Sequence, residues 1–276
     1  MDDTVLRYAA FTTTPAGGNP AGVVLDASEL TDQQMLALAK EVGYSETAFV
    51  TRRDGRNLDV RYFSPEAEVP FCGHATVAAA VAVAERLGPG DLLFRTRAGE
   101  VPVAVDEGLR ATLTSVEPAL EEVDAASLDQ ALRLLGWSAA ELDPQLPPRI
   151  GYAGARHLIL AAATRDRLAR LSYDFDGLAQ FMRARDLTTV DLVHRESESV
   201  YHVRNPFPVG GVVEDPATGA AALAFGHYLR ALGLVPATAE LTLHQGDNLG
   251  RPGVLTVALT EGDARVRVSG TAVVIP

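Results

Sequence analysis

The chain contains one lysine and one cysteine among its 276 residues, and both scarcities restrict its chemistry. Lys40 lies within 31–42, an amphipathic segment that a Thr31–Gln34 capping box predicts to be a surface helix. A Schiff-base enzyme would need this lysine as its nucleophile, which a surface helix does not favour. Because Cys72 has no second cysteine to pair with, no internal disulfide forms, and we expect a cytoplasmic protein.

Long apolar runs and positive charge are also scarce. The longest apolar run, 75–84, is too short to span a bilayer, and the acidic start Met1-Asp-Asp-Thr does not fit a signal peptide. The formal net charge of −12 disfavours nucleic acids and anionic membrane surfaces as partners. An anionic substrate would therefore need a local positive field, which helix N-termini can supply.

Common cofactor patterns are missing as well. No glycine-rich dinucleotide turn, phosphate loop or Gly-x-Ser-x-Gly elbow occurs in the sequence. We expect no metal, because the histidines form no His-x-x-x-His pair and have no cysteine at metal-binding spacing. The six histidines stand at positions 74, 157, 194, 202, 227 and 244.

Two stretches that do stand out place a tight turn before an apolar helix. Phe71-Cys-Gly-His-Ala-Thr76 precedes 77–87, and Glu214-Asp-Pro-Ala-Thr-Gly219 precedes 220–232. A helix without a polar face is buried all round, and the free N–H groups of its first turn can bind an anion. The repetition suggests one small anionic ligand held between two similar halves. Counting back from Gly88 and Gly233, the usual helix-ending residues, places Cys72 opposite Ala217 and His74 opposite Gly219.

Short strand-like segments surround both apolar helices in the sequence. This pattern predicts an α/β (α+β) fold in which each half is a curved sheet wrapped around one buried helix. The proline-rich segment 141–148 cannot be helix or central strand and marks the approximate start of the second half. Strands are expected near 4–11, 21–25, 46–51, 57–63, 91–97, 100–106, 109–115, 156–162, 188–195, 199–204, 239–244, 253–259, 264–269 and 271–275, and surface helices near 126–135, 165–171 and 175–184. The helix near 126–135 would start at a Ser127–Gln130 capping box.

Six motifs occur in one order along nearly the whole chain. The motifs are Gly-Asn-Pro-Ala-Gly-Val-Val-Leu (18–25), Ser-Glu-Thr-Ala-Phe-Val (45–50), Phe-Ser-Pro (63–65), Cys-Gly-His-Ala-Thr (72–76), Glu-Asp-Pro-Ala-Thr-Gly (214–219) and Gln-Gly-x-x-x-Gly-Arg-Pro (245–252). Together they resemble the PhzF-like (phenazine biosynthesis-like) proteins, relatives of diaminopimelate epimerase.

This resemblance implies a homodimer whose chains each consist of two halves with the active site in the cleft between them. We assign 1–117 to the N-terminal half and 118–263 to the C-terminal half, with 264–276 returning to the first. The implied activity is that of a cofactor-independent isomerase of the trans-2,3-dihydro-3-hydroxyanthranilate isomerase type. Such an enzyme shifts a proton and a double bond on a small carboxylate-bearing metabolite, here in secondary-metabolite biosynthesis.

The resemblance also assigns three catalytic residues, each with an alternative interpretation. Glu46 falls where the family keeps its general acid/base, although locally it is only an exposed acid at a strand start. His74 would contact the substrate and help to move protons, whereas a lone histidine here is often a core or capping residue. Asp215 would hold a polar group of the substrate, could cap the following helix, or could do both.

Further positions are assigned to substrate binding by the same resemblance. Asn19 would otherwise be an ordinary turn residue. Many family members have serine at the position of Ala220, so this chain lacks one hydroxyl and its substrate could differ from the phenazine-pathway compound. The assigned binding residues are Asn19, Ser45, Gly73, Ala75, Thr218, Gly219 and Ala220.

Cys72 occupies the position of a catalytic thiol in diaminopimelate epimerase, where a second thiol acts from the other half. The single cysteine of this chain excludes a two-thiol mechanism. We therefore expect Cys72 to be a small, buried packing residue. Two other functions stay open: a hydrolase or lyase on the same site, and a binding protein without turnover. Retention of Glu46, His74 and Asp215 together argues against the binding protein.

Overall fold

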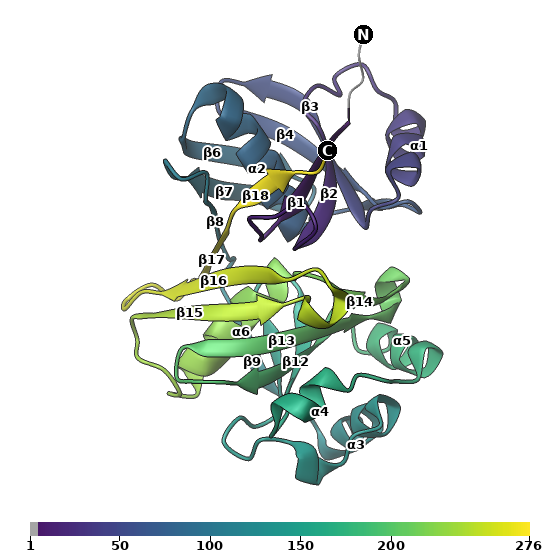
Figure 1. Cartoon of the computed structure of the whole chain (residues 1–276), viewed down its shortest axis with the longest axis vertical. Coiled ribbons are helices and arrows are strands. Elements are labelled where there is room, and N and C mark those ends of the chain that lie inside the picture. The colour runs from purple at the N-terminus through teal and green to yellow at the C-terminus, as the bar shows by residue number, and fades with distance from the viewer. Residues whose placement is uncertain (1–4) are drawn as a thin grey trace. The chain divides into compact units, whose positions relative to one another are not determined.

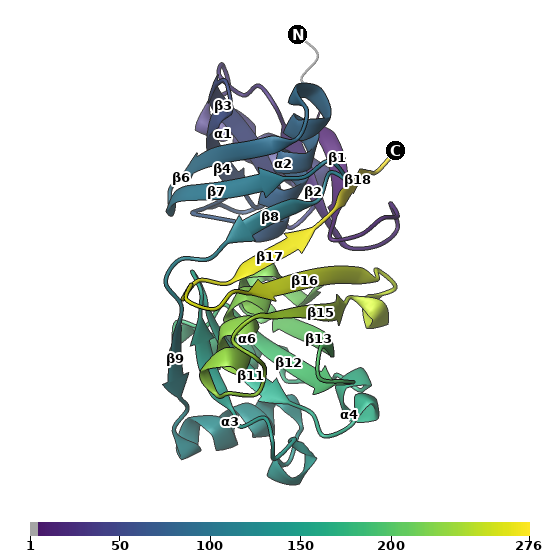
Figure 2. The same cartoon turned by 90° about the vertical axis from the view of Figure 1, so that its left-hand side faces the viewer.

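The computed structural model describes residues 5–276, and these form two compact units whose elements are labelled in Figures 1 and 2. The N-terminal unit contains the described residues up to Thr114, together with Gly250–Gly253 and Ser269–Pro276. The C-terminal unit comprises Ser115–Leu249 and Val254–Val268. Both units combine strands with helices, which confirms the predicted α/β (α+β) class. The assignment of 1–117 and 118–263 to two functional halves remains a prediction.

A mixed sheet wraps around helix α2 (Gly73–Leu87) in the N-terminal unit (Figure 2). Every residue from His74 to Ala84 is buried, as the absence of a polar face predicts. The sheet order is β18–β1–β2–β3–β4–β6–β7–β8, with β2–β3 and β4–β6 parallel and the other pairs antiparallel. Its strands are β1 (Leu6–Ala10), β2 (Asn19–Val24), β3 (Glu46–Asp54), β4 (Asn57–Phe63), β6 (Gly90–Thr96), β7 (Gly99–Val105), β8 (Ala111–Thr114) and β18 (Ala272–Val274), with the short β5 (Glu68–Val69) beside β4.

The parallel pair β2–β3 defines one edge of the sheet in the N-terminal unit. Parallel neighbours need a crossover, and helix α1 (Asp32–Val42) supplies it. Its predicted Thr31–Gln34 capping box is confirmed, and Gly43 ends the helix in the left-handed region at φ 71°. Since Ala21 of β2 pairs with Glu46 of β3, the two strands begin at the same edge.

The sheet of the C-terminal unit lies between helices on both faces. Helix α6 (Gly219–Ala231) contacts β9, β10 and β11, while α3 (Ala125–Leu135), α4 (Arg165–Ala169) and α5 (Phe175–Arg183) cover the other face. The strand order is β9–β10–β11–β12–β13–β15, and β14 also pairs with β13. These strands are β9 (Ala119–Glu122), β10 (Arg149–Tyr152), β11 (Arg156–Ala161), β12 (Thr189–Arg195), β13 (Val200–Phe207), β14 (Val212–Asp215) and β15 (Ala239–Gln245). Strands β16 (Gly253–Leu259) and β17 (Arg267–Gly270) have residues in both units, and 3-10 turns cover Ala139–Glu141, Pro208–Gly210 and Asp247–Leu249.

The structure corrects several predicted elements. Helix α3 is capped by Asp124, which accepts from Ser127 N at 2.9 Å, and not by the predicted Ser127–Gln130 box. Strands β5, β9, β10 and β14 were not predicted, because with two to four residues each they are too short to show an alternating apolar pattern. Strand β17 begins at Arg267, three residues later than expected. Among the residues described, no helix is long and apolar enough to cross a membrane.

A buried chain of hydrogen bonds links three neighbouring strands of the C-terminal unit. His157 Nδ1 lies 2.7 Å from Thr189 Oγ1, which donates to Asn205 Oδ1 at 2.7 Å, and Asn205 Nδ2 donates to Asp191 Oδ1 at 3.1 Å. Within the described part of the chain, His157 Nε2 and Asp191 Oδ2 have no hydrogen-bond partner. Burial lowers the pKa of His157 to about 3 and raises the pKa of Asp191 to about 7, because the charged forms are disfavoured there.

These two shifts predict opposite effects of pH on stability. The pKa of Asp191 is raised on folding, so its contribution is complete below pH 3.8 and is lost as the pH rises toward about 7. The pKa of His157 is lowered, so its contribution is complete above pH 6.5 and is lost as the pH falls toward about 3. Between pH 4.5 and pH 6.5, the free energy of unfolding of Asp191→Asn should therefore rise relative to that of the unaltered protein, by up to roughly 2–3 kcal/mol. Over the same interval, that of His157→Gln should fall relative to the unaltered protein by a similar amount. Urea unfolding of the three proteins at both pH values measures these differences, and a change of the same sign in both variants would contradict the prediction.

Candidate active site

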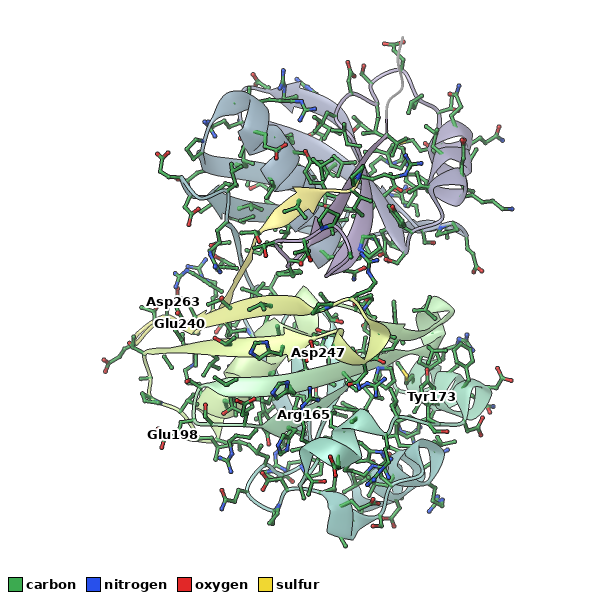
Figure 3. The ribbon with its side chains drawn as sticks, viewed as in Figure 1. Arg165, Tyr173, Glu198, Glu240, Asp247 and Asp263 are labelled. Atoms are coloured by element: carbon green, nitrogen blue, oxygen red, sulfur yellow. The ribbon has the colours of Figure 1, made fainter. Side chains whose placement is uncertain are left out.

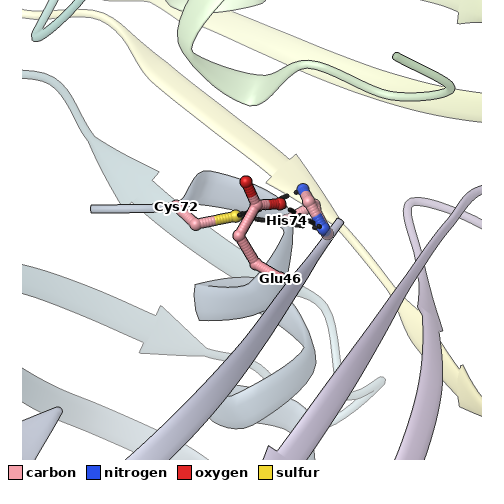
Figure 4. A group of neighbouring side chains, drawn as sticks. All are labelled: Glu46, Cys72 and His74. Atoms are coloured by element: carbon pink, nitrogen blue, oxygen red, sulfur yellow. Dashed lines mark hydrogen bonds and ion pairs between the residues drawn. The ribbon is translucent and has the colours of Figure 1, made fainter. Parts of the chain in front are cut away.

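Five polar side chains of the N-terminal unit meet at the start of α2, and Figure 4 draws three of them, Glu46, Cys72 and His74. Asn19 begins β2, Glu46 begins β3 after Ser45, and His74 lies in the first turn of α2 behind its N-cap Cys72. The common edge of β2 and β3 brings the first three to this point. The fold thus unites three motifs that lie far apart in the sequence.

Glu46 is the most accessible member of a close carboxylate–thiol–imidazole group. Its Oε2 lies 3.5 Å from His74 Nε2 and accepts from Cys72 Sγ, also at 3.5 Å. The Glu46 side chain is 14% exposed and the His74 side chain 5%. A carboxylate in this position can exchange a proton with a ligand while the other two groups stay largely covered.

The His74 ring is held at both of its nitrogens. Asn19 Nδ2 lies 3.1 Å from Nδ1, and Ser45 Oγ lies 3.3 Å from Nε2. If the Asn19 amide donates, Nδ1 is the acceptor and the ring proton sits on Nε2, which faces the Glu46 carboxylate. This arrangement orients the imidazole toward the accessible carboxylate.

Cys72 is buried, as expected, but its surroundings are not simply apolar. Its thiol lies 3.3 Å from His74 Nδ1 and, as noted, contacts the Glu46 carboxylate. Only 8% of the residue is exposed. The interpretation of Cys72 as a packing residue is therefore incomplete, because its sulfur belongs to the polar group at the helix start.

The start of α2 leaves backbone N–H groups available for an anion. The N-cap Cys72 provides no side-chain cap, so the first-turn N–H groups of Gly73, His74 and Ala75 have no intrahelical acceptor. The Cys72 carbonyl is fixed by Thr76, whose N and Oγ1 donate to it at 3.0 and 2.7 Å. A helix start of this kind attracts a carboxylate or phosphate.

Arg251, which had no predicted role, secures the turn before Asn19. Its Nε donates to Gly18 O at 2.9 Å and its Nη2 to Gly17 O at 2.8 Å. Gly18 has φ 53°, and a Cβ at Gly17 would lie 2.5 Å from Pro252 O, so the turn requires both glycines. The sequence signal was the last motif, which ends in Gly-Arg-Pro.

In the C-terminal unit, Asp215 and Thr218 are joined by Gln245, a second residue without a predicted role. Thr218 Oγ1 donates to Asp215 Oδ2 at 2.6 Å, and Gln245 Oε1 accepts from Thr218 N at 2.9 Å. Gln245 Nε2 donates to Asp215 O at 2.8 Å. Thr218 is the N-cap of α6, so the proposed capping role of Asp215 is wrong; its carboxylate instead braces the turn.

The register between the two apolar helices also needs correction. Helix α2 begins at Gly73 and α6 at Gly219, and α2 has 15 residues against 13 in α6. Counted from the helix starts, Cys72 corresponds to Thr218 and His74 to Ala220. Counting back from Gly88 and Gly233 differs from this by one residue, because α2 is two residues longer than α6 while Gly233 lies one residue further beyond its helix than Gly88 does.

The strand that carries Asp215 is anchored by a buried ion pair that the sequence analysis missed. Arg204 of β13 donates from Nε to Glu214 Oε1 at 2.9 Å and from Nη2 to Oε2 at 2.5 Å, and only 1% of the Glu214 side chain is exposed. Arg204 Nη1 also donates to Ala169 O at 2.7 Å. On the same strand, Val213 O accepts from the hydroxyl of Tyr173, labelled in Figure 3, at 2.5 Å.

The predicted site residues therefore form one group in each unit. The N-terminal group contains Asn19, Ser45, Glu46, Gly73, His74 and Ala75, and the C-terminal group contains Asp215, Thr218, Gly219 and Ala220. Each group lies at the start of a buried helix, and each is braced by a residue of the Gln-Gly-x-x-x-Gly-Arg-Pro motif.

Comparison with known proteins agrees with these features. The family model of the phenazine biosynthesis-like proteins (PhzC-PhzF) matches residues 8–276. The uncharacterized isomerase YfhB of Bacillus subtilis (strain 168) is 32% identical over 98% of this chain and 95% of its own length. The trans-2,3-dihydro-3-hydroxyanthranilate isomerase of Pseudomonas fluorescens is 30% identical, covering 96% of this chain and 94% of its own. The crystal structure of a PhzF-family phenazine biosynthesis protein from Bacillus anthracis matches with a TM-score of 0.88 at 28% identity, over 99% of this chain and 96% of that one. The chain thus belongs to the phenazine biosynthesis-like family, and it is an enzyme of the isomerase class.

Proposed function

We propose that this isomerase shifts a proton, and with it a double bond, on a small carboxylate-bearing metabolite. The observation that carries the proposal is the partly exposed Glu46 carboxylate beside a His74 ring oriented by Asn19 and Ser45. The similarity to the Pseudomonas fluorescens enzyme supports a related cyclic acid as substrate. No step of the proposed reaction needs a cofactor.

In the proposed mechanism, Glu46 removes a proton from an activated carbon and returns it to another carbon on the same face. His74 and Asp215 orient the substrate and stabilise the charge that develops. The N–H groups of Gly73 and Ala75 bind the substrate carboxylate. Thr218, Gly219 and Ala220 are proposed to supply further substrate contacts. Holding carbon and base together lowers the barrier by orientation.

A solvent-isotope assay tests the proposal. The protein is incubated in D₂O with trans-2,3-dihydro-3-hydroxyanthranilate and with a panel of unsaturated carboxylic acids, and the products are analysed by mass spectrometry. We expect an isomer of the same mass or one unit heavier. Cleavage or hydration products would support a lyase or hydrolase instead, and the absence of both exchange and product across the panel would support a binding protein. The panel is necessary because Ala220 lacks the serine hydroxyl that many relatives have at this position, so the substrate could differ from theirs.

We also propose that the protein is a cytoplasmic homodimer. The dimer is suggested by the family resemblance, and the reduced Cys72 thiol at the site suits a reducing compartment. Sedimentation equilibrium at micromolar concentration should give about twice the chain mass of 29.3 kDa. A mass equal to that of one chain would contradict the dimer.

A further inference from the structure

The structure places three metal-binding types of side chain close together at the start of α2. One ligand atom each from Glu46, Cys72 and His74 can be chosen so that all lie within 4.8 Å of one another (Figure 4). Sequence spacing gave no sign of this, because Cys72 and His74 are only two residues apart and the third ligand arrives from β3.

Two of the three distances among these atoms are those of a tetrahedral metal site, and the third is slightly longer. Zn–S bonds of about 2.3 Å and Zn–N or Zn–O bonds of about 2.0–2.2 Å give tetrahedral edges of about 3.3–3.7 Å. The observed separations are 3.5 Å for Glu46 Oε2 to His74 Nε2, 3.5 Å for Cys72 Sγ to Glu46 Oε2, and 3.9 Å for Cys72 Sγ to His74 Nε2. A shift of a few tenths of an ångström would therefore close three edges of the tetrahedron around one ion.

Charge and the supporting contacts also suit a divalent cation. A thiolate and a carboxylate together supply two negative charges, which outweigh the partial positive charge of the helix start. Asn19 lies 3.1 Å from His74 Nδ1, the nitrogen opposite the proposed ligand Nε2. With its amide oxygen turned toward the ring, Asn19 would accept the Nδ1 proton, as partners of metal-bound histidines usually do.

We propose that Glu46, Cys72 and His74 bind Zn²⁺ through three protein ligands and one open position. Binding releases the thiol proton to solvent, while the ion keeps its oxidation state. Because the Glu46 carboxylate coordinates the metal, it cannot accept a proton from the substrate, and the metal inhibits the enzyme. This inhibition rests on the proposed function, whereas metal binding itself rests only on the geometry of the three side chains.

Cobalt(II) tests the proposed metal binding without any substrate. Cys72 is the only cysteine, so a thiolate-to-cobalt charge-transfer band in the near ultraviolet reports on this site alone. We expect that band with a stoichiometry of one and its displacement by Zn²⁺. It should be lost in Cys72→Ser, and Asn19→Ala should weaken binding roughly 10–100-fold.

A surface cluster provides the matched control. His202 pairs with Glu196 and lies 3.8 Å from Asp247, which Figure 3 labels, so it is another histidine–carboxylate group in the chain. His202→Gln should leave the cobalt spectrum unchanged. Absence of the band in the unaltered protein, or its persistence in Cys72→Ser, would overturn the site. In activity assays, equimolar Zn²⁺ should stop turnover and EDTA should restore it; full activity with the metal bound would overturn the inhibition.

Discussion

Glu46→Gln should lower turnover roughly 10²–10⁴-fold, the usual contribution of general acid–base catalysis. The amide keeps the shape and polarity of the side chain but cannot carry a proton. Ligand binding should survive, because the amide still forms hydrogen bonds and the N–H groups at the start of α2 are untouched. Steady-state kinetics with the substrate found in the D₂O screen, together with calorimetric binding, separates the two effects.

Two companion variants show whether the carboxylate or the thiol does the chemistry. Glu46→Asp should also lose activity, since withdrawing the carboxylate by one methylene spoils its reach to the carbon. Cys72→Ser should keep most activity, although its thiol lies 3.5 Å from the Glu46 carboxylate. An active Glu46→Gln together with an inactive Cys72→Ser would transfer the role of proton carrier to the thiol.

Arg204→Met should destabilise the protein by about 3–5 kcal/mol, the largest stability effect we expect of a single side chain. The substitution leaves the Glu214 carboxylate, whose side chain is 1% exposed, charged and without its bidentate partner. It also removes the donor to Ala169 O. Urea unfolding at neutral pH measures the loss.

The double variant Arg204→Met/Glu214→Leu is the matched control for this effect. It removes both charges and fills a similar volume, so its stability should return to within about 2 kcal/mol of the unaltered protein. If the double variant were as unstable as Arg204→Met, the cost would come from lost packing and not from a buried unpaired charge.

The fold could be predicted where the information is local. The eleven buried residues of α2 have no polar face, which alone requires enclosure by a sheet. The Thr31–Gln34 box and Gly43 likewise fix both ends of α1 within a few residues. Strands β10 and β14 could not be found in this way, because each has only four residues, too few to show an alternating apolar pattern.

The site could be predicted in part, for a similar reason. Family resemblance identified Glu46 and His74, and the structure shows them in contact. Gln245, Arg251 and Arg204 were missed because their function lies in bonds to distant backbone or charged groups. Cys72 was interpreted as a packing residue because nothing near it in sequence reveals that Glu46 approaches from β3.

The most direct test of the account compares the unaltered protein with Glu46→Gln in D₂O, using the same substrate and following the product by NMR. The account predicts that the unaltered protein forms an isomer with a new C–H or C–D bond at a different carbon, without cleavage. It also predicts that Glu46→Gln binds the substrate but forms this bond at least about 100-fold more slowly. Formation of the same bond at an unchanged rate in Glu46→Gln would contradict the assignment of Glu46 as the proton carrier.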